Sequence, residues 1–189
     1  MSSKKAIIFS APSGAGKTTI VQHLLQQDLP LEFSVSACSR KPRGQEKEAH
    51  DYYFLSPEAF KSKVQEGAFM EWEEVYANMF YGTLNAELER IWNKDMQVVF
   101  DVDVVGGINL KDKFKDRALS IFIAPPSLKV LEQRLTDRGT DNSSDIAKRL
   151  AKAQEELAKQ DQFDVIVSND NLEVACQEVL KQVSDFLKK

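Results

Sequence analysis

Apolar residues along the chain form short continuous runs, and these runs alternate with stretches of helical periodicity. A short apolar run between turn signals is typical of a strand that is buried on both faces of a sheet. The main runs lie at residues 5–10, 97–100, 118–124 and 165–167. Between them, apolar side chains recur every three or four residues, as in Leu128, Leu131 and Leu135. Strands that alternate with helices predict an α/β fold, with a mainly parallel sheet covered by helices on both faces.

Polar residues mark where several helices begin and end. Ser56 followed by proline predicts a helix that starts at residue 57, and Gly67 ends it. Asp170 and Glu173 have the spacing of a capping box and predict the start of the last helix. Residues 33–95, which are rich in short strand-like stretches, interrupt the alternation and resemble an insertion into the α/β core.

The segment SAPSGAGKTT, residues 10–19, follows the first apolar run and precedes a helical pattern. Gly14 and Gly16 allow the backbone to curl, so that successive N–H groups point at one centre. A helix N-terminus favours phosphate, Lys17 can reach the β- and γ-phosphates, and the Thr18 hydroxyl can bind Mg²⁺. Ala11 replaces the first glycine of the usual pattern, which is tolerable if its φ angle is negative. The sequence therefore predicts a nucleotide-binding loop.

Composition narrows the class of protein. The formal net charge is −4, which argues against general nucleic-acid or membrane binding, so local Lys and Arg residues must hold any anionic ligand. Cys38 and Cys176 are too few for a metal site or a disulfide framework and indicate a reducing compartment. The apolar stretches are too short for a signal peptide or a membrane span, so we expect a cytoplasmic protein.

A second anion site is indicated by Arg40 and Arg43, which lie on either side of a proline. The planar arginine fork matches phosphate oxygens, and nearby tyrosines could add hydroxyl donors. For the isolated motif, a solvated basic turn is the alternative. A third cluster comprises Arg134, Arg138 and Arg149, of which the first two are one helical turn apart and could close over phosphates or form an ordinary charged face.

Motifs in order along nearly the whole chain resemble the guanylate kinase family. The matching stretches are SAPSGAGKTT, FSVSACSRKPRGQE, DYYF, FMEWEEV, FYGT, VVFDVD, FIAPPS, RLTDRGTD, KRL, AQ and VIVSND. The resemblance implies a P-loop nucleoside monophosphate kinase with a core at 1–32, 96–126 and 160–189, a GMP-binding insertion at 33–95 and a lid at 127–159. The chain departs from the family pattern at Ala11, at Val105 and in an extra residue before YGT. If YGT anchors the alignment, Tyr81 is the predicted phosphate ligand.

The resemblance also implies roles for single residues. GMP would be bound by Ser36, Arg40, Arg43, Tyr52, Glu71, Tyr81, Thr83 and Asp103. ATP would be bound by Ala11, Pro12, Ser13, Gly14, Ala15, Gly16, Lys17, Thr18, Thr19 and Asn169. The catalytic cations would be Lys17, Arg40, Arg134, Arg138 and Arg149. Mg²⁺ would be bound directly by Thr18 and through water by Asp101.

The chemistry of guanine agrees with these implied roles. Guanine presents N1–H and N2–H₂ donors beside the O6 acceptor, so an ionised Glu71 could accept two hydrogen bonds while the Thr83 hydroxyl donates to O6. We expect Mg²⁺-dependent transfer of a phosphoryl group from ATP to GMP, in a monomer or homodimer that binds neither nucleic acid nor membrane. The alternatives are an inactive, phosphopeptide-binding relative of the family and a kinase for another nucleoside monophosphate.

Overall fold

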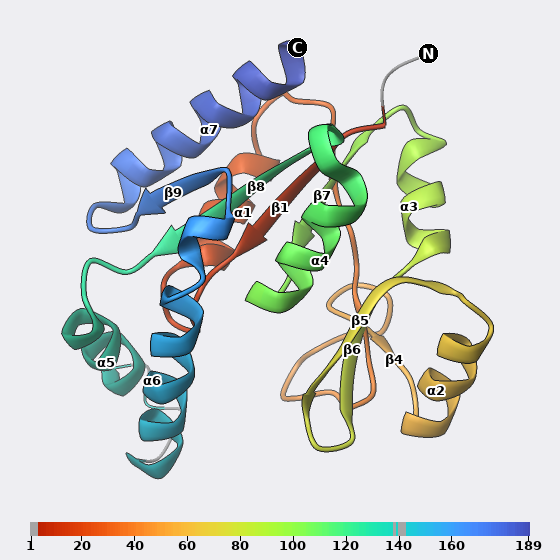
Figure 1. The fold of residues 1–189 in the computed structure, drawn as a ribbon, viewed down its shortest axis with the longest axis horizontal. Coiled ribbons are helices and arrows are strands. Elements are labelled where there is room, and N and C mark those ends of the chain that lie inside the picture. The colour runs from red at the N-terminus through yellow and green to blue at the C-terminus, as the bar shows by residue number, and fades with distance from the viewer. Residues whose placement is uncertain (1–3, 138, 140–142) are drawn as a thin grey trace. The chain divides into compact units, whose positions relative to one another are not determined.

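The computed structural model describes residues 4–137, 139 and 143–189, and the chain divides into two compact units (Figure 1). The first unit contains Lys4 and Pro30–Val99, and the second contains Lys5–Leu29 and Phe100–Lys189. Strand β7 (Gln97–Asp101) crosses the boundary between them.

The second unit is an α/β layer structure. Its elements are β1 (Ala6–Ser10), α1 (Lys17–Leu25), α4 (Val104–Phe114), a 3₁₀ turn (Lys115–Arg117), β8 (Ala118–Ala124), α5 (Leu128–Asp137), α6 (Ser143–Leu157), a 3₁₀ turn (Gln160–Gln162), β9 (Val165–Ser168) and α7 (Leu172–Lys188). Strands β1, β8 and β9 pair in parallel, and the Val102 N–H donates to the Phe9 carbonyl at 3.1 Å where β7 ends.

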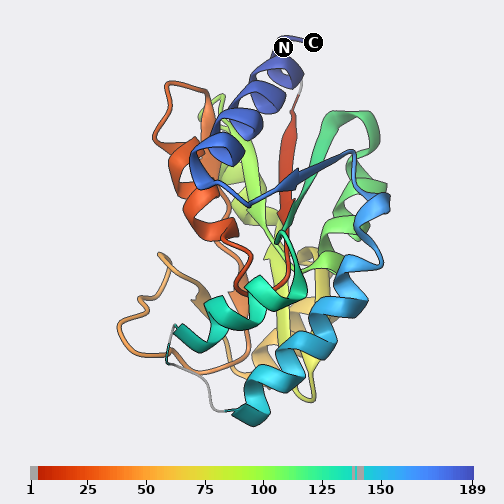
Figure 2. The same cartoon turned by 90° about the vertical axis from the view of Figure 1, so that its left-hand side faces the viewer.

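Burial explains why these strands read as unbroken apolar runs. Every residue of β1 and β8 is buried, because helices cover both faces of the sheet. Helix α1 packs against α7, and α4 packs against β1 and β8 on the opposite face (Figure 2). With β2 (Leu31–Phe33) paired in parallel to β7, the strand order is β2-β7-β1-β8-β9. The predicted α/β fold with a mainly parallel sheet is confirmed.

The first unit contains a smaller mixed sheet. The elements of this unit are β2 (Leu31–Phe33), β3 (Ala37–Cys38), β4 (Tyr53–Phe54), α2 (Pro57–Gln65), β5 (Phe69–Tyr76), β6 (Met79–Leu84) and α3 (Asn85–Trp92). The sheet has the order β4-β3-β6-β5, in which β6 pairs antiparallel with both its neighbours. Phe60 of α2 packs on Phe80 of β6 and on Ala37, which gives this unit a core of its own.

The helix boundaries are confirmed in part. Ser56 caps α2 as predicted, with its hydroxyl accepting the Ala59 N–H at 3.1 Å. The predicted capping box at Asp170 is wrong, because Asn171 caps α7 and accepts the N–H groups of Glu173 and Val174 at 3.0 and 3.2 Å. Either side chain suits a cap locally, and the backbone conformation decides between them. Among the described residues, no helix combines the length and apolarity needed to cross a membrane.

Candidate active site

The predicted nucleotide-binding loop lies between β1 and α1 in the second unit. Gly14 and Gly16 both have φ of 92°, a conformation that residues with a Cβ rarely adopt, so the predicted use of glycine is confirmed. Ala11 lies outside the positive-φ region, which is why alanine is tolerated in place of glycine. Within the described chain no side chain caps the start of α1, so its first N–H groups face the loop and suit an anion.

Lys17 is the first residue of α1 and contacts the end of β7. Its ammonium pairs with the Asp101 carboxylate and donates to the Val102 carbonyl at 3.0 Å. The two side chains are 17% and 21% exposed, so they form a partly buried ion pair that a ligand can reach. Thr18 and Thr19 follow on the exposed side of the helix. Among the described residues, no three His, Cys, Asp or Glu side chains gather as a cation site.

Asn169, just after β9, lies directly against the loop. Its buried amide donates to the Ala15 carbonyl at 2.7 Å, and a Cβ on Gly16 would lie only 2.2 Å from the Asn169 Nδ2. Its backbone carbonyl accepts Arg134 Nη2 at 2.9 Å. The residue that the family resemblance puts beside adenosine therefore also holds the loop and an arginine of α5.

Of the three predicted lid arginines, one contacts this loop and another contacts Asn169 beside it. Arg134 on α5 contacts Asn169, and Arg149 on α6 donates to the Ser13 hydroxyl at 2.9 Å. Helices α5 and α6 pack through Leu131, Leu135 and Ala153 with neighbouring apolar side chains. Arg138, the third, lies outside the described residues.

Glu156 on α6 is a charged residue of this region that the sequence did not indicate. Its side chain is 12% exposed and lies 3.9 Å from the ammonium of Lys152. Burial raises the pKa of Glu156 to about 7, and the charges of Lys152, Asp103 and Lys17 also act on it. Only its i,i+4 spacing from a lysine was visible in the sequence, and exposed helix faces share that signal.

We expect Glu156→Gln to stabilise the protein above pH 7 and to have little effect below pH 4.5. The folded pKa of about 7 exceeds the ordinary 4.5, so the folded state binds more protons between these values and loses stability as the pH rises through them. Urea unfolding of both proteins across this pH range measures the difference. A stability difference that does not grow with pH would contradict the raised pKa.

The predicted acceptor residues lie mostly in the first unit, around Arg40. This side chain is 7% exposed, and its Nε donates to the Tyr81 Oη at 3.1 Å. Its guanidinium lies 4.9 Å from the centre of the Tyr52 ring, which meets the Tyr81 ring edge to face. Phe80 instead points to the other side of β6, where it packs on Phe60. Arg43 follows in the exposed loop.

Glu71 and Thr83 form a buried pair across β5 and β6. Glu71 is 7% exposed and Thr83 is fully buried, and the Thr83 hydroxyl donates to Glu71 Oε1 at 2.8 Å. A hydroxyl has one proton, and Thr83 donates it to the Glu71 carboxylate. Ser36 is half-buried, and its carbonyl accepts the Tyr53 N–H at 2.9 Å.

Asp103 is the one predicted GMP residue that belongs to the second unit. Its carboxylate accepts the Gly106 N–H at 3.0 Å and caps α4. The cap also places the start of α4 at Val104, three residues after Asp101 at the end of β7.

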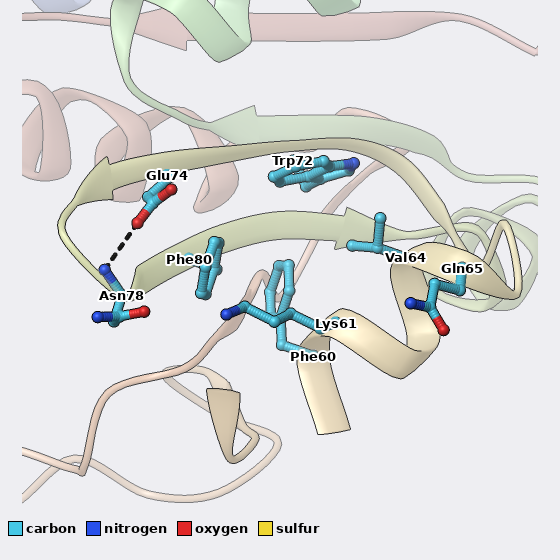
Figure 3. Close-up of a pocket in the computed structure, with 8 residues that line it drawn as sticks. All are labelled: Phe60, Lys61, Val64, Gln65, Trp72, Glu74, Asn78 and Phe80. Atoms are coloured by element: carbon cyan, nitrogen blue, oxygen red, sulfur yellow. Dashed lines mark hydrogen bonds between the residues drawn. The ribbon is translucent and has the colours of Figure 1, made fainter. Parts of the chain in front are cut away.

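A separate groove of about 340 Å³ lies between α2 and the β5–β6 hairpin (Figure 3). It is lined by Phe60, Lys61, Val64, Gln65, Trp72, Glu74, Asn78 and Phe80. None of these residues was predicted to bind a nucleotide, so the groove is distinct from the residues assigned to GMP.

Comparison with known proteins agrees with the motifs. The family model for guanylate kinase matches residues 3–186. Guanylate kinase of Bacteroides thetaiotaomicron is 51% identical over 98% of this chain and 91% of its own, and that of Porphyromonas gingivalis is 46% identical over 98% and 99%. The crystal structure of guanylate kinase from Anaplasma phagocytophilum superposes with a TM-score of 0.81 at 26% identity, covering 100% of this chain and 88% of that one. This chain belongs to the guanylate kinase family.

Proposed function

We propose that the protein transfers the γ-phosphoryl group of ATP to GMP and forms ADP and GDP. The observation that supports this proposal is the presence of two clusters of groups that suit an anion, the Lys17 loop in one unit and the Arg40 cluster in the other. A kinase that transfers a phosphoryl group from one nucleotide to another needs one such cluster for the phosphates of each nucleotide. Relatives up to 51% identical that are named guanylate kinases support the same reaction.

The residues of the second unit would bind the ATP phosphates. The N–H groups of the loop and the Lys17 ammonium would neutralise charge on the transferred group, and Arg134 and Arg149 would add to it from α5 and α6. We propose residues 127–159 as the lid and residues 33–95 as the GMP-binding insertion. No nucleophilic side chain is needed, because the acceptor is already an anion, and the protein contributes alignment and charge neutralisation.

Mg²⁺ fits the oxygen donors near the loop. It prefers hydroxyl, carboxylate and phosphate oxygens, and Thr18 and Asp101 supply the first two. When bound with ATP, the ion would add positive charge beside the transferred phosphoryl group. Asp101 pairs with Lys17, so its carboxylate is held at the end of β7, beside the loop.

The base would be read by Glu71 in its buried pair with Thr83. A carboxylate in a buried site accepts the N–H donors of guanine, whereas adenine offers neither N1–H nor an amine at C2. A site built to accept these bonds rejects an analogue that lacks them, because its own polar atoms are left unpaired.

A coupled assay of ADP release with GMP, AMP, CMP, UMP and dGMP tests the proposed function. We expect turnover with GMP and little with AMP, CMP or UMP. Comparable turnover with another nucleoside monophosphate would favour a different specificity. No turnover with any of them would favour the phosphopeptide-binding alternative.

Replacing Arg40 or Arg43 with alanine should weaken GMP binding by about 1.5–3 kcal/mol, the usual worth of a charge-assisted hydrogen bond, and leave ATP binding unchanged. Arg40→Ala should have the larger effect, because this arginine is buried and its loss removes the cation that pairs with the Glu46 carboxylate. Calorimetric titration of each variant with GMP and with ATP measures the two affinities. Lys41→Ala is the matched control, since this exposed lysine lies between the arginines. Equal losses for ATP and GMP would indicate a folding defect instead.

A further inference from the structure

The carboxylate of Glu46 joins the two arginines of the acceptor cluster. Its Oε2 accepts Arg40 Nη1 at 2.6 Å, and its Oε1 accepts Arg40 Nη2 at 2.8 Å. The same Oε2 accepts the backbone N–H of Arg43 at 2.8 Å. The Glu46 N–H returns a hydrogen bond to the Arg43 carbonyl at 3.0 Å, which closes a turn. One carboxylate therefore holds a side chain and a backbone segment together.

The paired arginine has little freedom left. Tyr81 accepts its Nε–H, the Lys41 carbonyl accepts from Nη1 at 3.1 Å, and Glu46 accepts from both terminal nitrogens. Four of the five N–H groups of the guanidinium are thereby engaged. Hydrogen bonds therefore hold the Arg40 guanidinium within its plane, and the Tyr52 ring packs against its face.

The charges of the pair favour the same arrangement. Hydrogen bonding to Arg40 lowers the pKa of Glu46, and hydrogen bonding to Glu46 raises the pKa of Arg40. Both groups are therefore ionised at neutral pH. Because Tyr81 accepts from the guanidinium, its own hydroxyl proton is not used in that bond and can be donated to a further acceptor.

We propose that Glu46 is a positioning residue for the acceptor phosphate. It fixes the plane of Arg40 and the turn at Arg43, so that one Arg40 N–H, the Tyr81 hydroxyl and the Arg43 side chain can meet the phosphate without further ordering. Preorganised donors bind better because no rotamer freedom is lost on binding. This inference rests on the proposed role of Arg40 in GMP binding.

The test compares Glu46→Gln with the wild type, with Arg40→Ala as reference and Glu48→Gln as matched control. Glu48 lies in the same loop and accepts the Phe54 N–H at 2.9 Å. Its substitution therefore tests the effect of loop order on GMP binding without changing a contact to Arg40 or Arg43. Steady-state kinetics give KM and kcat for GMP and KM for ATP. Inhibition by guanosine, which has no phosphate, isolates the contribution of the base and sugar.

We expect Glu46→Gln to raise KM for GMP by about tenfold, because Arg40 and the turn at Arg43 must then be ordered when GMP binds. The KM for ATP and the guanosine inhibition constant should stay unchanged, and Glu48→Gln should behave as the wild type. Glu46→Asp keeps the charge and should recover part of the affinity.

Three results would overturn the inference. A lower KM for GMP in Glu46→Gln would mean that the carboxylate competes with the phosphate for Arg40. A parallel loss of guanosine inhibition, or the same loss in Glu48→Gln, would mean that Glu46 only orders the loop. Unchanged GMP kinetics in Glu46→Gln beside a large loss in Arg40→Ala would reject the role of Glu46 alone. If Arg40→Ala also kept its GMP affinity, the proposed phosphate site itself would be wrong.

Discussion

Lys17→Ala should abolish phosphoryl transfer while leaving GMP affinity nearly unchanged. Lys17 is the side-chain cation at the start of α1, and its ammonium is held beside the loop by Asp101 and the Val102 carbonyl. A preorganised donor of this kind is worth about a hundredfold to a thousandfold in kcat, and a full positive charge on a phosphoryl group is worth more. Single-turnover kinetics and calorimetric titration with GMP measure the two effects separately.

Two controls accompany the Lys17 variant. Lys17→Met keeps much of the length of the side chain without its charge and should be as inactive as the alanine variant. Lys181→Ala removes an exposed lysine of α7 and should retain full activity. Turnover retained by Lys17→Ala would mean that the loop is not the phosphoryl-donor site.

Glu71→Gln should reduce kcat/KM for GMP by at least about 2 kcal/mol, with little change for ATP. Glu71 is buried and already accepts the Thr83 hydroxyl, so its carboxylate faces the interior with a fixed partner. Glutamine keeps the shape but replaces one acceptor by an NH₂ donor, which would oppose a guanine N1–H or N2–H₂. Steady-state kinetics with GMP and AMP provide the measurement.

The two substrates should respond in opposite ways to Glu71→Gln. The N1 of AMP is an acceptor, so AMP should lose nothing or gain slightly, and the GMP/AMP ratio should fall. Glu74→Gln is a suitable control, because Glu74 lies on the same strand but lines the separate groove and holds the Asn78 N–H at 2.7 Å. An undiminished preference for GMP would assign base selection to Ser36, Thr83 and Asp103 without Glu71.

Local sequence patterns were sufficient for the α/β class, the strand–loop–helix unit and the glycines of the loop. These features depend on neighbouring residues, because burial on two faces requires an unbroken apolar run and positive φ favours glycine. The resemblance to the family then indicated which residues would bind each nucleotide. Where two nearby side chains suit one local role, as Asp170 and Asn171 do at the start of α7, sequence alone could not choose between them.

Contacts between distant residues were decided only by the tertiary structure. Asn169 holds the Ala15 carbonyl across 154 positions, and Arg149 reaches Ser13 across 136. Burial raises the pKa of Glu156, although the residues next to it in the sequence do not distinguish it from an exposed glutamate. The sequence by itself predicted the α/β class and the elements proposed to bind phosphate. Folding decided which side chains meet, because hydrogen bonds and desolvation depend on position in space, whereas local patterns depend on position along the chain.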